Sequence, residues 1–121
     1  MEFGKQRWIF PDAECPPEGV NSILGHESII ILNTGDLDAH VIVKFFYTDR
    51  PPVIATKITI EAERVRCIKT NEQKIFGENK AVVGEQYAIM IESDIPVVAQ
   101  YGRAETREVA FYTTPGYACG I

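Results

Sequence analysis

Residues 39–48 read AHVIVKFFYT, and this stretch decides the fold class. Side chains along an extended strand point alternately to its two faces. Both alternating sets are largely apolar here: Val41, Val43, Phe45 and Tyr47 on one face, and Ile42, Lys44, Phe46 and Thr48 on the other. A strand with two apolar faces is typical of the centre of a sheet. We therefore expect this strand to be central and covered on each side.

Other short segments rich in β-branched and aromatic residues flank this strand, and turn-forming residues separate them. We expect strands at residues 28–32, 53–60, 64–69, 86–93 and 97–101, and a last one between Glu108 and Tyr112. Turns are expected at residues 33–38, 61–63 and 94–96. Residues 71–84 show no clear period and are interpreted as a loop with one helical turn after Asn71.

The predicted fold is all-β. It is a single-domain antiparallel β-sandwich over residues 1–121, jelly-roll or immunoglobulin-like in outline. With 121 residues, of which 45% are hydrophobic and 24% charged, the chain can bury one core and remain soluble. Its N-terminal residues are polar, and no apolar run approaches the ~18 residues that span a bilayer. The cytoplasm is therefore the expected location.

Charge and cysteine usage narrow the function classes. A net charge of −5 disfavours nucleic acid as a partner, because neutralising phosphates requires a basic excess. The cysteines Cys15, Cys67 and Cys119 are odd in number and widely spaced, so we interpret them as buried or half-buried thiols rather than as a disulfide framework. With only His26 and His40 to add, neither a metal nor another cofactor is expected. No phosphate-binding loop or nucleophile elbow occurs, and we expect no enzyme.

The segment Gly25-His26-Glu27, just before a predicted strand, is one candidate for ligand binding. A histidine beside a carboxylate can bind hydroxyl groups or act as an acid/base pair. Neighbours in a strand point to opposite faces, however, so His26 and Glu27 should not converge once the strand begins. A loop hydrogen bond or a subunit contact is the alternative role.

The residues from Gln100 to Arg103 form a second polar candidate, at the end of an apolar strand. If Gly102 marks a bulge that resets the alternation, Gln100, Tyr101 and Arg103 line one rim. Such a rim suits a polyhydroxylated or anionic small molecule, although tyrosine and arginine are also enriched at subunit interfaces.

A third candidate is the pair of arginines Arg64 and Arg66, which share one face of a predicted strand. Two guanidinium groups at this spacing can clamp a carboxylate or a phosphate. The alternative is a solvated face paired with nearby acids.

Several short motifs follow one another in order along the chain, from Trp8 to about Ala118. They read GHE at 25–27, ILNTGD at 31–36, DAHV at 38–41, FYTDRPP at 46–52, IESDIPVV at 91–98 and QY-x-R at 100–103. Each piece alone is a weak signal, whereas the ordered series is specific, and it resembles the sensory rhodopsin transducer family. The family usually has serine where this chain has Gly25, and it tends to place a histidine where Cys67 follows Arg66.

The resemblance implies a compact β-sandwich, assembly as a homotetramer and a role without catalysis. By matching position, it carries His26, Glu27, Arg64, Gln100 and Arg103 over as site residues. The leading hypothesis is a transducer-like binding and signal-relay module whose partner is a membrane photoreceptor or another signalling protein. The alternative is a stand-alone carbohydrate or sugar-acid binding domain that senses a metabolite, with Tyr101, Trp8 or Tyr47 as its stacking platform. An enzyme that uses His26 and Glu27 is a third hypothesis.

Overall fold

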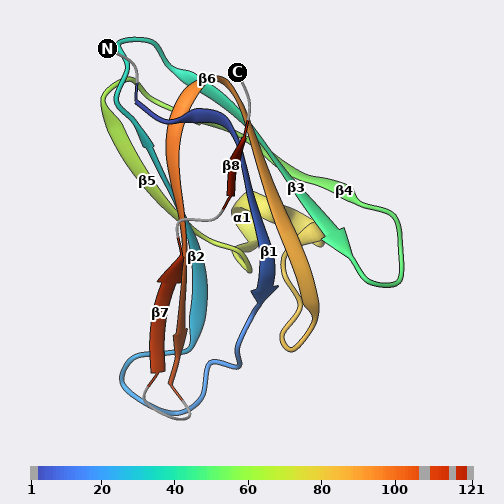
Figure 1. The fold of residues 1–121 in the computed structure, drawn as a ribbon. Helices are drawn as coiled ribbons and strands as arrows, with labels where there is room; N and C mark the ends of the chain where they lie inside the picture. The colour runs from blue at the N-terminus through green and yellow to red at the C-terminus, as the bar shows by residue number, and fades with distance from the viewer. Residues whose placement is uncertain (1–2, 107–109, 115–116, 120–121) are drawn as a thin grey trace.

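The computed structural model describes residues 3–106, 110–114 and 117–119 (Figure 1). Within these ranges the chain is almost entirely extended. Its elements are β1 (Lys5–Glu14), β2 (His26–Asn33), β3 (Ala39–Tyr47), β4 (Val53–Ile60), β5 (Arg64–Lys69), α1 (Gln73–Phe76), the 3-10 turn η1 (Gly77–Asn79), β6 (Gln86–Glu105), β7 (Ala110–Thr114) and β8 (Tyr117–Cys119).

Two sheets share the long strand β6. The first has the order β4-β3-β6-β1-β8, and the second has β5-β2-β6-β7. The strands named here pair antiparallel throughout. The inner faces of both sheets contribute to one core, with Phe10, Val43 and Ile89 from the first and Ile29 and Ile68 from the second. The predicted all-β sandwich is therefore confirmed.

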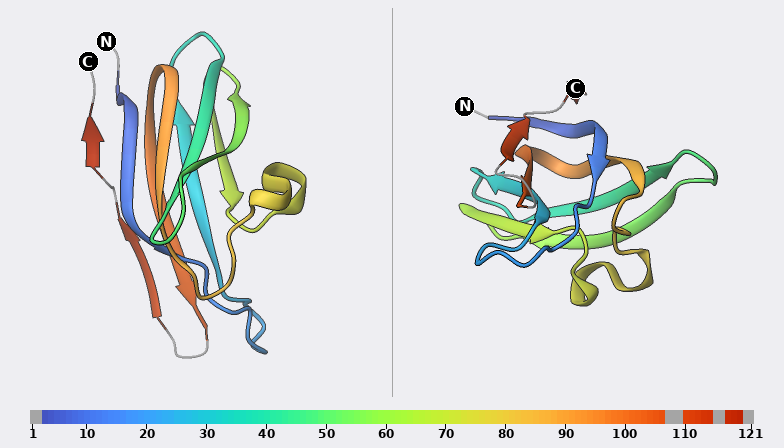
Figure 2. Two further views of the ribbon diagram at one scale, coloured as in Figure 1. Left: turned by 90° about the vertical axis from the view of Figure 1, so that its right-hand side faces the viewer. Right: turned by 90° about the horizontal axis from the view of Figure 1, so that it is seen from below.

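The strand β6 passes from one sheet to the other at residues 94–96. Its first half pairs with β3 as far as Ser93, and its second half pairs with β2 from Val98 onward. The chain arches over between the two halves, as two views show (Figures 1 and 2). We expected a turn here between two separate strands; the direction does change, but the backbone stays extended and forms one element. Pro96 is tolerated because the pairing with β1 is irregular at this point.

The N-terminal strand β1 was not predicted. It lies between β6 and β8, and its register on β6 shifts between Phe10 and Ala13, which accommodates Pro11. The indole of buried Trp8 donates a hydrogen bond to the carbonyl of Val97 at 2.9 Å. Long-range pairing thus fixes a segment whose own sequence gives a weak strand signal.

Two turns meet at one end of the sandwich. The amide of the buried Asn33 donates to the carbonyls of Leu37 and Ile60 at 2.8 and 3.0 Å, while its oxygen accepts the N–H of Gly35. The N–H of Glu63, in the corner between β4 and β5, donates to the carbonyl of Gly35 at 3.1 Å. The turns predicted at 33–38 and 61–63 are thus confirmed, and they are tied to each other.

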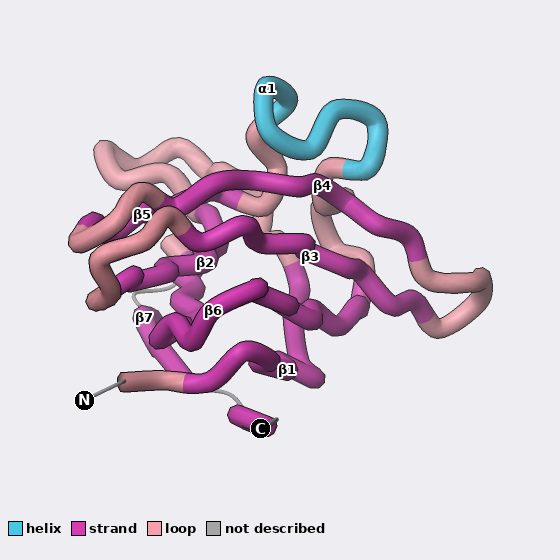
Figure 3. The backbone as a smooth tube through the Cα atoms, turned by 90° about the horizontal axis from the view of Figure 1, so that it is seen from above, coloured by secondary structure: helices cyan, strands magenta, loops and turns pink. Residues whose placement is uncertain are grey.

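The short helix α1 stands outside the strands, beside β4 (Figure 3). The hydroxyl of Thr56 in β4 donates to the carbonyl of Ile75 at 2.7 Å, and the ring of Phe76 stacks on Phe45 with centroids 5.3 Å apart. The single helical turn predicted after Asn71 is therefore present, and it begins at Gln73. Burial of Phe76 contributes roughly 2 kcal/mol of hydrophobic free energy to holding it there.

The central position predicted for residues 39–48 is confirmed, because β3 lies between β4 and β6. Coverage on both sides is wrong in part. The inner residues such as Val43 are buried, but Ile42 and Phe46 on the outer face are only half-buried. The last predicted strand is found at Ala110–Thr114, whereas its expected start at Glu108 lies outside the described residues.

Candidate functional site

A carboxylate sits in the middle of the core. Strand alternation points Glu27 inward at the start of β2, and only 1% of its surface is exposed. Its Oε1 accepts hydrogen bonds from the hydroxyls of Thr70, at 2.7 Å, and Tyr87, while its Oε2 accepts one from Tyr101. Buried charge is tolerated only when it is paired or hydrogen-bonded. These three donors meet that condition.

Arg103 completes this arrangement from the neighbouring strand. It lies directly opposite Glu27 in the β2–β6 register, and its Nε donates to the hydroxyl oxygen of Tyr101 at 3.1 Å. The Tyr101 hydroxyl therefore donates to a carboxylate and accepts from a guanidinium. Hydrogen bonds assisted by charge in this way are stronger than neutral ones. We call the five residues Glu27, Thr70, Tyr87, Tyr101 and Arg103 the carboxylate hub.

The environment of the hub keeps its hydroxyl donors protonated. Burial, reinforced by the charge of Glu27, raises the pKa of Tyr87 and of Tyr101 well above the ordinary phenol value. The same two causes raise the pKa of the nearby Cys15 thiol to about 11. A group that does not titrate near neutral pH is a poor acid or base there. The hub is thus built to hold a charge in place rather than to move protons.

The structure gathers only half of the predicted site residues. Glu27, Tyr101 and Arg103 meet in the hub, on the inner side of the second sheet. The register of β2 on β6 runs from His26 to Leu32 without a shift, so Gly102 is not a bulge. The rim that depended on this bulge is therefore absent, and Gln100 faces the side opposite to Tyr101 and Arg103, as simple alternation requires. Whether the gathered residues bind a ligand stays a prediction.

The other candidates point elsewhere. His26 faces away from Glu27, as the alternation requires, and its Nδ1 lies 2.8 Å from the carbonyl oxygen of Leu24. Gln100 is exposed on the outer side of the second sheet. Arg64 donates to the carbonyl of Glu63 at 3.1 Å, at the far end of β5. Arg64 and Arg66 share an exposed face there, as expected.

Sequence reasoning missed two members of the hub, Thr70 and Tyr87. Tyr87 shares a face with Ile89 and Ile91 at the start of β6, where apolar residues alternate regularly, and all three are buried. A tyrosine on a buried apolar face needs a hydrogen-bond partner for its hydroxyl. This requirement is the signal that could have predicted a polar group in the core. Thr70 gives no comparable signal, because it follows β5 directly and belongs to no periodic run.

The cysteines are only partly as expected. Cys15 is buried, whereas Cys67 is exposed on the outer side of β5, so the interpretation as a buried or half-buried thiol is wrong for Cys67. The side chain of Cys119 lies outside the described residues. Among the side chains that the structure describes, no three of His, Cys, Asp and Glu gather closely enough to hold a metal ion.

An ordered pair of polar residues lies on the outer side of the first sheet. The Nδ1 of His40 is 2.8 Å from Oδ2 of Asp94, whose Oδ1 accepts the backbone N–H of His40, also at 2.8 Å. These two hydrogen bonds lower the pKa of Asp94. Because Nδ1 lies against the carboxylate, Nε2 is the ring nitrogen that faces away from Asp94. The pair borders a shallow hollow of about 580 Å³ that Lys57, Thr59 and Glu92 also line.

The outer side of the second sheet carries an apolar band around Leu32, and exposed Gln100 borders this band opposite Ile30. Register places Leu32 between Val65 and Val98, and Ile30 next to Cys67. Leu32, Val65 and Cys67 are exposed, and 62% of Val65 is open to solvent. We call Ile30, Leu32, Val65, Cys67 and Val98 the outer apolar face. A contiguous exposed apolar patch of this kind is typical of an interaction surface.

The fold and these surfaces define a class of protein: an all-β sandwich with a hydrogen-bonded carboxylate in its core and with exposed apolar and polar residues on its outer faces. A family model described as Anabaena sensory rhodopsin transducer matches residues 3–118. The chain therefore belongs to the Anabaena sensory rhodopsin transducer family, as the ordered motifs implied.

Two solved structures resemble this chain closely. One is the crystal structure of Thermotoga maritima 1070, with 31% identity and a TM-score of 0.81, covering 95% of each chain. The other is the Anabaena sensory rhodopsin transducer, with 30% identity and a TM-score of 0.72, covering 84% of this chain and 99% of the other. No curated protein matches. Neither short helix in the described part of the chain, α1 or η1, has the length or apolar character needed to cross a bilayer.

Proposed function

We propose that the protein is a non-catalytic signal-relay module that works as a homo-oligomer, a homotetramer by analogy with its family, in the cytoplasm. Its partner is a membrane photoreceptor or another signalling protein. Membership of a transducer family supports the relay role. The absence of catalysis is supported by the hub, where three hydroxyls occupy the Glu27 carboxylate and burial keeps both phenols protonated.

The observation that carries the oligomer is the outer apolar face. Its rows of Leu32, Val65 and Val98 are aliphatic, and a flat patch can pair with its own copy about a two-fold axis. A stable interface buries about 800 Å² on each partner, and this is the area that the outer apolar face and the residues around it must supply. One such contact makes a dimer, so a tetramer needs a second contact elsewhere on the surface.

Size-exclusion chromatography with light scattering tests the assembly. Val65→Glu places a charge in the outer apolar face and should reduce the number of subunits. Val82→Glu is the matched control, because Val82 is 57% exposed in the segment before β6, away from this face. A monomeric wild-type protein at working concentration would count against the proposal. An unchanged subunit number in Val65→Glu would move the interface to another surface.

A second candidate function is carbohydrate or sugar-acid binding. The hollow beside His40 favours it, because an imidazole, carboxylates and the ammonium of Lys57 together can satisfy hydroxyl and carboxylate groups. The stacking platform suggested by the sequence must be corrected. Tyr101 and Trp8 are buried in the core, and the ring of Tyr47 is covered by the guanidinium of Arg50 at 3.6 Å.

A thermal-shift screen with sugars and sugar acids tests this candidate. A ligand at 100 times its dissociation constant stabilises the native state by about 2.7 kcal/mol, which raises the melting temperature by several degrees. Asp94→Ala should abolish the shift, since it removes both oxygens that hold His40 in its fixed orientation. No shift with any compound would leave a protein partner as the better answer.

A further inference from the structure

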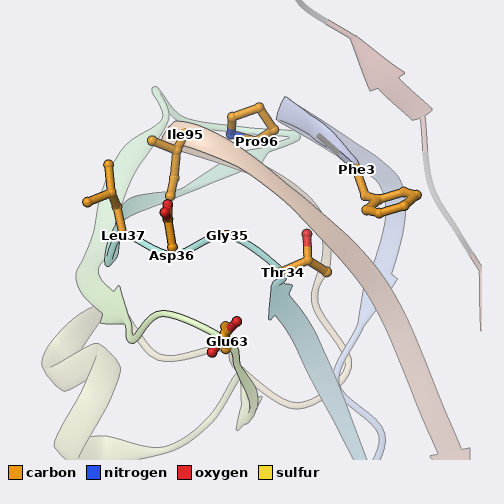
Figure 4. Close-up of a pocket in the computed structure, with 8 residues that line it drawn as sticks. All are labelled: Phe3, Thr34, Gly35, Asp36, Leu37, Glu63, Ile95 and Pro96. Carbon is orange, nitrogen blue, oxygen red and sulfur yellow. The ribbon is translucent and has the colours of Figure 1, made fainter. Parts of the chain in front are cut away.

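A hollow of about 380 Å³ lies at the end of the sandwich where the two tied turns meet (Figure 4). It is open to solvent and combines apolar walls with two carboxylates. Its lining residues are Phe3, Thr34, Gly35, Asp36, Leu37, Glu63, Ile95 and Pro96. We call it the loop hollow.

The walls of the loop hollow are apolar. Phe3 and Leu37 each expose more than half of their surface, at 55% and 65%, and Ile95 and Pro96 come from the arch of β6. These side chains originate from three separate segments of the chain. Together they offer a surface against which a hydrocarbon stem can pack.

The two carboxylates of the loop hollow are available to a ligand. Asp36 and Glu63 are exposed, and neither side chain forms an ion pair or a hydrogen bond with any residue that the structure describes. Their neighbour Asp38 differs, because its Oδ1 accepts the N–H of Ala62 at 2.9 Å. The loop hollow therefore holds two negative charges that the fold itself does not use.

The position of Glu63 is fixed by the backbone. Its N–H donates to the carbonyl of Gly35, the residue next to Asp36. Its φ of +55° lies in the left-handed region, which costs a non-glycine residue about 1–2 kcal/mol. Glycine would adopt this conformation without strain. A glutamate here therefore costs conformational free energy and adds a carboxylate to the corner.

We propose that the loop hollow docks a basic side chain carried on an apolar segment of a partner protein. The apolar side chains of the segment pack against Phe3, Ile95 and Leu37, which line different parts of the hollow, while Asp36 and Glu63 attract its cation. Charge complementarity identifies the occupant, because two unused carboxylates on a chain of net charge −5 attract a cation and repel an anion. The inference rests on the proposed relay between proteins and adds where and through which chemistry the partner is held.

A designed peptide tests the ligand chemistry. The probe is a fluorescein-labelled hexapeptide that alternates arginine with isoleucine, and its control replaces each arginine with citrulline, which has nearly the same shape but no charge. Fluorescence polarisation should show binding of the arginine peptide only, weakening as salt is added. Equal binding of the citrulline peptide would overturn the proposal. The proposal would also be overturned if the protein bound spermidine or Ca²⁺ at Asp36 and Glu63 but did not bind the arginine peptide.

Protein variants test the location. Asp36→Asn and Glu63→Gln should each weaken binding of the arginine peptide by about threefold to tenfold. Glu78→Gln makes the same charge change on the exposed η1 turn, outside the loop hollow, and should leave binding unchanged. If all three variants lost the same amount of peptide affinity, the loss would be explained by the change in net charge, and the proposed site would be overturned.

The outcome is separable from that of the proposed assembly. Val65→Glu acts on the outer apolar face, which shares no residue with the loop hollow. A Val65→Glu protein with fewer subunits that still binds the peptide would support both proposals independently. If the wild-type protein assembles as proposed but does not bind the peptide, the docking site would be refuted and the proposed assembly would stand.

Discussion

Replacing Glu27 with glutamine keeps the size of the side chain but removes its charge and one of its acceptor oxygens. In the wild-type protein that carboxylate accepts three buried hydroxyl donors and lies opposite Arg103. A hydrogen bond to a charged group contributes about 1.5–3 kcal/mol, and hydroxyls can reorient to accept from the new amide. We therefore expect Glu27→Gln to lower the free energy of unfolding by about 2–4 kcal/mol. Glu27→Leu should cost more, because no acceptor remains.

Urea denaturation at fixed protein concentration measures this loss, provided that the slope of the transition is unchanged. Glu92→Gln is the matched control. Glu92 lies 3.5 Å from Arg7, and the Arg7 side chain is exposed while that of Glu92 is partly exposed, so its loss should cost less than about 1 kcal/mol. Combining Glu27→Gln with Tyr87→Phe should cost less than the sum of the two single losses, because the two groups share a hydrogen bond. A loss in Glu27→Gln no larger than in the control would refute the account of the hub.

Three further predictions concern single contacts. Gly4→Ala should destabilise the protein by roughly 2 kcal/mol or more, because its φ is +89° and a Cβ would lie 2.1 Å from the Val97 carbonyl oxygen; Gly19→Ala, at φ +72° with its nearest contact at 3.5 Å, should lose about half as much by urea denaturation. The pKa of Asp94 is lowered by the His40 backbone N–H and ring, so its contribution to stability is present above the unfolded value of about 3.9 and is lost as the pH falls through the lower folded value. An NMR titration should show that His40→Ala, which keeps the backbone donor, raises this pKa only part of the way; no change would exclude the ring as a cause. With its pKa raised to about 11 by burial and by Glu27, Cys15 should resist alkylation at pH 8 while exposed Cys67 reacts, as peptide mass spectrometry can check; equal labelling of the native protein would contradict this.

Much of the sandwich could be predicted from local sequence. Alternation identified β3, β4 and β5, because each strand carries its own apolar face and ends at turn-forming residues. β1 could not be found in this way, since Pro11 and its charged neighbours weaken the local signal. Its position depends on pairing with β6, some eighty residues away in the chain. Long-range register of this kind leaves no trace in a local pattern.

The candidate site was harder to predict than the fold. Alternation correctly separates His26 from Glu27, but the grouping of Gln100 with Tyr101 and Arg103 depended on a bulge that β6 does not have. Motif spacing identified polar residues without indicating whether they face solvent or the core. Glu27 and Arg103 are predicted as site residues by their neighbours in the sequence and by their match to family positions, and neither signal indicates whether a side chain faces solvent or the core. In the structure Glu27 is buried and Arg103 is half-buried, because the hydroxyls of Thr70, Tyr87 and Tyr101 provide hydrogen-bond partners on the inner side.

The sharing of β6 between both sheets sets an order of events during synthesis. β3 and β4 are sequence neighbours and can pair as soon as both have left the ribosome. β1 cannot complete its pairing with β6 until the chain has been translated as far as Val97, and β2 must wait until Ala104. Through most of translation the nascent chain therefore carries unpaired strand edges, a state prone to aggregation that chaperones protect. Fast translation of the C-terminal part should therefore matter more for the yield of soluble protein than any single core contact.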